Sequence, residues 1–173
     1  MKEIKLTQRQ VALVDDNVFE YLNQWKWQAY ESHTKNKWYA TRGIWIPQKK
    51  RMTTIQMHRI IMNAHVAQQI DHINHNGLDN RKENLRFCTH LQNQWNSKKR
   101  VNGLFSRYKG LSKHLMRDGK RFYWRARIGV NGKNISLGLF HNEQDAANAY
   151  DNAAMKYFGE FAFLNRSMVR EAA

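Results

Sequence analysis

The sequence predicts an α+β protein made of small antiparallel sheets, one of which packs on a single long helix near the C-terminus. Most segments rich in aromatic and β-branched residues are short and alternate bulky with small or polar side chains, which is typical of half-buried strands. The dipeptides Asp118-Gly119 and Asn131-Gly132 are strong signals for hairpin turns. One alanine-rich segment follows Asn142, a good N-cap, and ends before Gly159, as helices commonly do.

The first third of the chain is predicted to form a small β-rich scaffold. Pro47, the only proline, begins a polar turn that ends at Arg51. The tryptophans of this region can pack a sheet or stack on nucleic-acid bases. The expected elements are strands over 4–6, 11–14, 25–30, 38–46 and 52–56, and a helix over about 17–24 with Asp16 as its N-cap.

A second helix is predicted over residues 57–64, where apolar side chains recur at helical spacing. His58 and Arg59 lie off that apolar stripe. Either side chain can contact a phosphate, and His58 can equally serve as a structural hydrogen-bonding group.

The central segment, residues 68–93, has the order strand, loop, strand, helix. Strands are expected over 68–73 and 85–88, and the loop between them is rich in Asn, Asp and Gly. Thr89 to Gln92 has the Ser/Thr-x-x-Gln form of a capping box, which predicts a helix that starts at Thr89. Asn93 then falls in the first turn of that helix.

Three side chains of this segment suit metal-assisted hydrolysis. A magnesium-like ion prefers hard oxygen ligands, which the carboxylate of Asp71 and the amide of Asn93 supply. A neutral His72 can take a proton from an attacking water, while the ion stabilises charge on a phosphate. Because neighbouring residues of a regular strand face opposite sides, Asp71 and His72 need an irregular strand end here.

The same segment resembles the His-Asn-His (HNH) endonucleases of the ββα-metal fold, in the subgroup found in phage and intron homing enzymes. Asp71-His72 resembles the opening pair, 83–86 the central asparagine element, and Asn93 the closing ligand, over about residues 57–97. The resemblance implies that His72 is the general base and that Asp71 and Asn93 bind one Mg or Mn ion. It also implies that Asn84 holds the loop and orients His72. Asp and Asn stand where many members have His, and the chain lacks the zinc-binding cysteines that brace some relatives.

The charge of the chain points to a polyanionic partner. The net charge is +15 over 173 residues. Between Lys98 and Lys133 there are twelve bases and one acid, whereas three bases and five acids follow, so the charge is a local patch. Cys88 is the only cysteine, which excludes an internal disulfide and a cysteine-based zinc site and fits a reducing compartment. No apolar run approaches the ~18 residues of a membrane span, so we expect a cytoplasmic protein of a bacterial or phage-infected cell, without a membrane partner.

A C-terminal module is expected after the basic stretch. Strands are predicted over 108–113, 123–128 and 134–140, followed by the helix over 142–158, whose apolar face comprises Ala146, Tyr150, Ala153, Ala154 and Tyr157. The strands carry the bases and the helix carries the acids, so a phosphate backbone should meet the sheet. Alternation places Arg125 and Arg127 on one face, where arginine can read guanine edges in the major groove. Trp124 belongs to the opposite face by alternation, and its role is open.

This module resembles the Apetala-type, or ethylene-response-factor, DNA-binding domain over about residues 105–165. The resemblance rests on 108–111, 124–126, 137–140, the 146–154 helix and the closing 161–165. It implies that the sheet reads duplex DNA, and the alternative is a basic sheet that grips DNA without base readout. The expected DNA contacts are Lys98, Lys99, Arg100, Lys109, Lys113, Arg121, Trp124, Arg125, Arg127 and Lys133.

Together these features predict a site-specific DNA endonuclease, by resemblance a homing endonuclease, that acts on double-stranded DNA with a divalent metal and no small-molecule cofactor. The expected domains are 1–97, a basic linker over 98–104, 105–166 and a tail over 167–173. A monomer or weak dimer is expected. The alternatives are a sequence-specific DNA-binding regulator with an inactive nuclease motif, and an RNA-binding protein.

Overall fold

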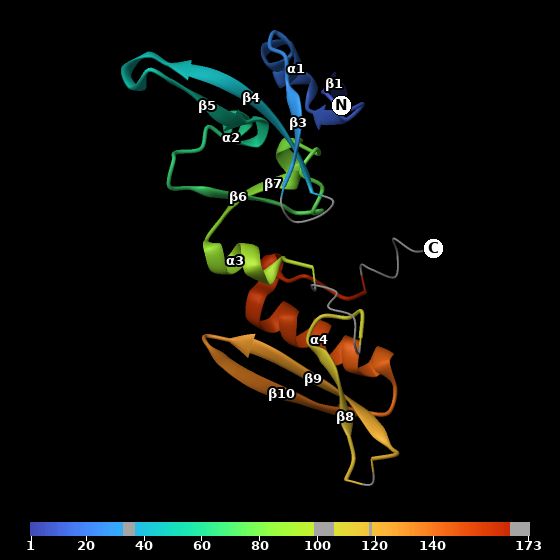
Figure 1. The fold of residues 1–173 in the computed structure, drawn as a ribbon. Coiled ribbons are helices and arrows are strands. Elements are labelled where there is room, and N and C mark those ends of the chain that lie inside the picture. Colours follow the sequence, from blue (N-terminus) through green and yellow to red (C-terminus); the bar gives the residue numbers. More distant parts are fainter. Residues whose placement is uncertain (33–36, 99–105, 118, 167–173) are drawn as a thin grey trace. The chain divides into compact units, whose positions relative to one another are not determined.

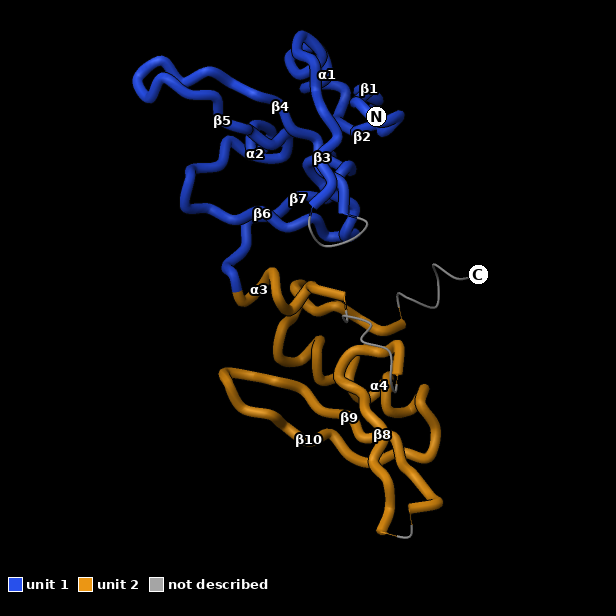
Figure 2. Tube along the Cα trace, viewed as in Figure 1, with its two compact units in different colours: residues 1–90 blue, residues 91–173 orange. Residues whose placement is uncertain are grey.

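The computed structural model describes residues 1–32, 37–98, 106–117 and 119–166. These residues form helices and four small antiparallel sheets, which confirms the predicted α+β class. The chain divides into two compact units, Met1–His90 and Leu91–Ala173, coloured separately in Figure 2. Within the described ranges, no helix is both long and apolar enough to cross a membrane.

The first unit contains three sheets, β1–β2, β3–β4–β5 and β6–β7 (Figure 1). A single buried cluster, which includes Val14, Leu22, Met57 and Leu78, joins the scaffold strands to the loop after β6. The scaffold and the central segment therefore share one core. The elements are β1 (Lys2–Lys5), β2 (Val11–Val14), α1 (Asp16–Asn23), β3 (Gln28–Glu31), β4 (Trp38–Ile46), η1 (Pro47–Lys49), β5 (Arg51–Gln56), α2 (Met57–Ile61), β6 (Gln69–His72), η2 (Lys82–Asn84) and β7 (Leu85–Cys88).

The predicted cap of the first helix is wrong. Asp15 holds the N-cap position of α1 without a side-chain cap, because its carboxylate accepts a hydrogen bond from the backbone N–H of Lys82 at 2.7 Å. The Asp16 carboxylate instead pairs with the N-terminal amino group at 2.7 Å. Both carboxylates are thus engaged by groups that lie far away in the sequence or outside the helix.

The third strand begins at Gln28, later than predicted, because the tryptophans before it pack against the helix. Trp27 is 3% exposed and its indole N–H donates to the Leu22 carbonyl at 2.9 Å, near the end of α1. Trp25 lies under the Arg42 guanidinium, 4.0 Å from the ring centre. These two tryptophans therefore pack the unit. The α2 helix ends at Ile61, three residues before the predicted end at Ala64.

The second unit packs one helix on one sheet, as predicted. Asn142 caps α4 by accepting from the backbone N–H of Asp145 at 2.7 Å. Tyr157 was predicted to face the sheet but is 40% exposed, and Phe158 is buried instead. The elements are α3 (His90–Trp95), β8 (Leu111–Leu115), β9 (Phe122–Val130), β10 (Lys133–Phe140), α4 (Glu143–Phe158) and η3 (Gly159–Phe161), with sheet order β10-β9-β8.

The helix–sheet contact depends on small residues. Ala126, Ala146 and Ala154 are essentially inaccessible. Gly110 has φ +80°, and a Cβ there would lie 2.1 Å from the Tyr150 ring, so no other residue fits this position. Trp124 packs partly against this core on the α4 side of the sheet, the face that strand alternation predicted, and its contact with DNA stays a prediction.

Helix α3 packs within the second unit. The Trp95 ring stacks on Phe158 with centroids 4.6 Å apart, and the Trp95 carbonyl accepts from the Phe163 N–H at 3.3 Å. The two units divide between His90 and Leu91, after the first residue of α3, whereas the expected first domain extended to residue 97. Most of the expected linker (98–104) and the expected tail (167–173) lie outside the described residues.

Candidate functional site

The loop between β6 and β7 is organised around Asn84, which is 6% exposed. Its Oδ1 accepts from the Asn74 N–H at 2.9 Å, and its Nδ2 donates to Asn74 Oδ1 at 3.0 Å and to the Asp79 carbonyl at 2.8 Å. The Ile73 N–H donates to the Asn84 carbonyl at 2.9 Å. Asn84 thus holds both ends of the loop that follows His72, as the family resemblance implied.

A buried acid that the sequence did not single out braces the same loop. Asp79 is 2% exposed, and its two carboxylate oxygens accept from Arg81 Nε at 2.8 Å and Nη2 at 2.7 Å. These hydrogen bonds hold the pKa of Asp79 below its ordinary value. Asp79 resembled an ordinary turn former in the sequence. Its nearness to Arg81 was the available signal for this pairing.

Backbone hydrogen bonds attach the loop to the N-terminal scaffold. The Leu13 N–H donates to Leu78 at 2.9 Å, and the Asn80 N–H donates to Leu13 at 2.8 Å. Gly77 lies against β4, where a Cβ would be 2.3 Å from the Trp38 carbonyl oxygen. The position of the loop is therefore set by β2 and β4 as well as by its own side chains.

His72 lies buried at the end of β6 in a cluster of rings. Its ring centroid is 5.0 Å from that of His58, at 86°, and 5.9 Å from that of Tyr39. Burial lowers the pKa of His72, against the opposing influence of Asn80, Asp71 and Asp79. An imidazole with a lowered pKa is uncharged at neutral pH and can accept a proton, which is what a general base requires.

His58 and Arg59 of α2, whose roles the sequence left open, are held by contacts within the first unit. His58 is 6% exposed, and burial lowers its pKa to about 3. Arg59 donates to the carbonyl oxygens of His65 at 2.7 Å and Gln68 at 2.9 Å, which fastens the segment leading into β6. Their placement fits the structural alternative for His58 and gives Arg59 backbone partners.

Asp71 forms a largely buried ion pair with Arg86. The Arg86 Nη2 and Nε atoms lie 2.8 Å and 3.1 Å from Asp71 Oδ2, and the side chains are 7% and 12% exposed. A carboxylate has two oxygens with about four lone-pair sites, so it can serve a guanidinium and a metal ion together. Asp71 therefore fits the role of an oxygen ligand. The irregular strand end expected at Asp71 and His72 is not present, because both residues lie in β6 and pair in unbroken register with Arg86 and Leu85.

Asn93 is an exposed residue of α3, in the second unit. Its pairing with Asp71 around an ion stays a prediction. Within the part of the chain that the structure describes, no three His, Cys, Asp or Glu side chains cluster as metal ligands would. The predicted site, with one carboxylate and one amide, is of a different kind.

The β8–β9–β10 sheet presents two of the expected DNA contacts on its face away from α4. Arg127 is exposed and pairs across the sheet with Ser136, and Arg125 pairs with Ser112 and Leu139. Lys113 is the cross-strand partner of Trp124 and so lies on the face of the sheet toward α4. Its ammonium is 4.5 Å from the centre of the Phe122 ring. Lys133 pairs with Val130, which packs partly against the core. Arg121 and Lys98 are exposed outside the strands, and Lys99 and Arg100 lie outside the described residues.

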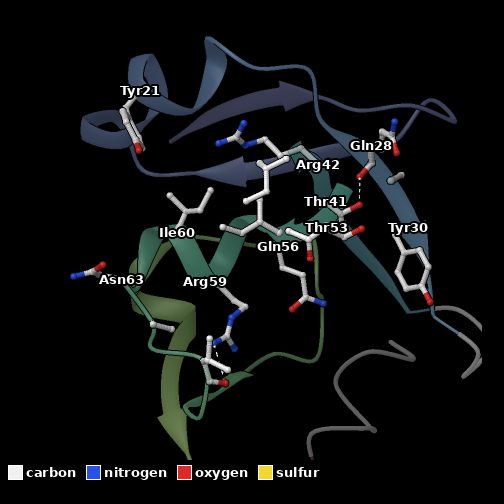
Figure 3. Close-up of a pocket in the computed structure, with 17 residues that line it drawn as sticks. Tyr21, Gln28, Tyr30, Thr41, Arg42, Thr53, Gln56, Arg59, Ile60 and Asn63 are labelled. Atoms are coloured by element: carbon white, nitrogen blue, oxygen red, sulfur yellow. Dashed lines mark hydrogen bonds between the residues drawn. The ribbon is translucent and has the colours of Figure 1, made fainter. Parts of the chain in front are cut away.

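The first unit also contains a cavity of about 1020 Å³ between β3–β4–β5 and α2 (Figure 3). Thr41, Gln56, Arg59 and Asn63 are among the side chains around it. None of the expected catalytic or DNA-binding residues lines this cavity, so it is separate from the β6–β7 loop.

Comparison with known proteins places the chain in a family. No family model matches the chain. A protein of Acanthamoeba polyphaga mimivirus, named an uncharacterized HNH endonuclease, is 30% identical over 139 residues, which are 77% of this chain and 68% of the relative. This chain belongs to the HNH endonuclease family.

This HNH family member is also similar, over a shorter region, to plant proteins named AP2-like ethylene-responsive transcription factors. One from Arabidopsis thaliana is 38% identical over 76 residues, which are 43% of this chain and 15% of the plant protein. One from Oryza sativa subsp. japonica is 42% identical over 67 residues, or 38% of this chain and 10% of the plant protein. The likeness therefore concerns a small part of each plant protein.

Proposed function

We propose that this HNH family member is a site-specific DNA endonuclease that hydrolyses phosphodiester bonds with one divalent metal ion, and that it is a homing enzyme of a phage or bacterial setting. The observation that carries the proposal is the buried imidazole of His72, whose pKa burial lowers, at the end of β6 and the start of a loop that Asn84 fastens. The names of the mimivirus and plant relatives support nuclease chemistry and DNA as the partner.

Each residue of the site has a defined task in this proposal. Asp71 and Asn93 would hold a magnesium or manganese ion, which supplies stabilisation of negative charge at the scissile phosphate. His72 accepts a proton from the attacking water through its neutral ring. Asn84 keeps the loop, and with it the His72 ring, in one position.

The elements around these residues follow the order of a ββα-metal motif. The β6 and β7 strands pair antiparallel, with Asp71 opposite Arg86 and His72 opposite Leu85, and α3 comes next in the chain. We propose that the active enzyme brings Asn93 of α3 to Asp71 to complete the motif.

The second unit would bind the duplex through its sheet. Arg125 and Arg127 share the face away from α4, and they are the residues most suited to contact phosphates or guanine edges. We propose that the enzyme acts as a monomer or weak dimer in the cytoplasm of the host cell.

The test is incubation of the purified protein with supercoiled plasmid in magnesium, manganese or EDTA. Nicked or linear product in the metal-containing reactions alone is the expected result. The second candidate function is a DNA-binding regulator with an inactive nuclease motif. It is supported by the plant relatives, which are named transcription factors. Retained duplex binding with no product in either metal would establish that alternative.

A further inference from the structure

The β4–β5 hairpin extends beyond the sheet to which it belongs. Strand β3 pairs with β4 only from Trp38 to Thr41, whereas β4 and β5 remain paired out to Ile46 and Arg51. Figure 1 shows this end of the hairpin running out from the rest of the first unit. We call residues 42–55 the outer ribbon. A two-stranded ribbon is at best marginally stable alone, so its length calls for a role outside the core.

One face of the outer ribbon is apolar and exposed. Trp45 and Met52 are directly opposite each other on the two strands and are 56% and 60% exposed. Gly43 lies beside them, and a Cβ there would be 2.9 Å from Met52 Cε, so the methionine lies flat over the glycine. Trp25 and Trp27 pack within the unit, whereas the side chain of Trp45 is exposed to solvent.

The tip of the outer ribbon is strongly basic. Lys49, Lys50 and Arg51 are consecutive and all exposed. No aspartate or glutamate occurs between Lys37 and Asp71 in the sequence. Three cations next to an exposed tryptophan–methionine pair are complementary to a polyanion that also offers flat apolar surface, which is the chemistry of a nucleic-acid groove.

We propose that the outer ribbon is a second DNA-binding element that contacts a groove of the substrate duplex. The inference rests on the proposed function for the identity of the partner. Lys49, Lys50 and Arg51 contact phosphates beside the groove, while Trp45 and Met52 pack on deoxyribose and base edges, as apolar side chains do in minor-groove complexes. The duplex is then held by the first unit independently of the sheet in the second unit.

The test measures binding of the full chain to a random-sequence duplex of about 40 base pairs in EDTA, which prevents cutting, as a function of salt. Each neutralised phosphate contributes about −0.9 to the log–log slope of affinity against salt. The triple variant Lys49→Gln, Lys50→Gln, Arg51→Gln should therefore have a slope that is shallower by about 2.7. The matched control is Lys5→Gln, Arg9→Gln, Lys26→Gln, which removes the same charge from exposed positions of the same unit and should change the slope little.

A second variant probes the apolar face. Trp45→Ala with Met52→Ala should weaken binding by about tenfold or more, because burial of these side chains against DNA is lost, while the salt slope stays that of the parent. All these positions are exposed, so the variants should have the same melting temperature as the parent protein.

Equal slopes for the basic-tip triple and its matched control would overturn the proposal. So would ribbon variants that change only the oligomeric state in sedimentation, since the partner would then be a second copy of the chain. Cutting of supercoiled plasmid is measured in parallel. A protein that never cuts, but whose duplex affinity depends on the outer ribbon, would refute the nuclease function and leave the ribbon's role standing.

Discussion

The ammonium of Lys109 lies 2.7 Å from the carbonyl oxygen of Trp95, the last residue of α3. It also donates to the carbonyls of Ser97 at 2.9 Å and Gln94 at 3.3 Å. The last carbonyls of a helix lack intrahelical partners, and a cation at that end also complements the helix dipole. Lys109, which the sequence analysis listed among the expected DNA contacts, thus caps the helix that carries Asn93.

Lys109→Met should loosen α3 without weakening DNA binding. The three carbonyls lose their donor, so the amides of residues 92–97 should exchange hydrogen faster. Misplacement of a ligand by about 1 Å can cost about 100-fold in rate, so metal-dependent cutting should fall about 10- to 100-fold. The control is Lys156→Met, which removes an exposed lysine of α4 that is not among the expected DNA contacts. Parent-like cutting together with parent-like exchange in Lys109→Met would contradict the capping role.

The buried ammonium also predicts a pH dependence. Burial lowers the pKa of Lys109 to about 8 from 10.5. Between these two values the unfolded chain binds more protons than the folded one, so this group makes stability rise with pH. In urea unfolding, the parent should therefore gain stability relative to Lys109→Met between pH 7 and pH 10. A constant difference between the two proteins would show that Lys109 titrates normally.

His72→Ala should abolish cutting while duplex affinity in EDTA stays within about twofold. General-base catalysis contributes about 10²- to 10⁴-fold, and no other described imidazole occupies this position in the loop. The matched variant is His65→Ala, an exposed histidine outside the β6–β7 loop, which should cut normally. Parent-rate cutting by His72→Ala would mean that another group takes the proton.

The metal assignment is tested most cleanly at Asn93. Asp71→Ala would also break the buried pair with Arg86, and such losses cost about 3–5 kcal/mol in stability. Asn93 is exposed, so Asn93→Ala should fold normally and require a higher magnesium concentration for nicking. Asn93→Asp keeps an oxygen ligand and should cut at lower magnesium than Asn93→Ala. Identical metal titrations for all three proteins would remove Asn93 from the site.

Neutralising the arginine face of the sheet should reduce the electrostatic part of binding. Arg125→Gln with Arg127→Gln removes up to two phosphate contacts, so the salt slope should fall by about 1.8. Lys156→Gln with Arg166→Gln removes the same charge from exposed positions in and just after the α4–η3 segment and should have little effect. Matching slopes for the two double variants would place the duplex elsewhere.

Elements whose signals are local were predicted well from the sequence. The Asn131-Gly132 turn, the Asn142 cap and the Gly159 stop each act within a few residues, and the second-unit hairpin and α4 follow them. The α1 cap was missed because Asp15 binds the Lys82 N–H, 67 residues away, and no local pattern reports such a partner.

In the candidate site, too, local sequence signals could be read, whereas contacts between distant segments could not. Asp71, His72 and Asn84 were predicted as site residues from the order of residues in one short segment, and their roles stay predictions. His58 and Tyr39 come from α2 and β4, and only tertiary packing brings their rings beside His72. Lys109 looked like one more base in a basic stretch, because the sequence does not show that α3 folds back onto it.

The backbone hydrogen bonds that join Leu13 to Leu78 and Asn80 make the N-terminal hairpin a support for the β6–β7 loop, although the hairpin contributes none of the proposed reactive groups. A fragment of residues 57–97 fused to another protein would carry every side chain of the first unit's motif. It would lack the β1–β2 hairpin that holds the β6–β7 loop. Conversely, an antibody or fusion partner that distorts the first fourteen residues should reduce the proposed cutting activity without contacting Asp71, His72 or Asn93.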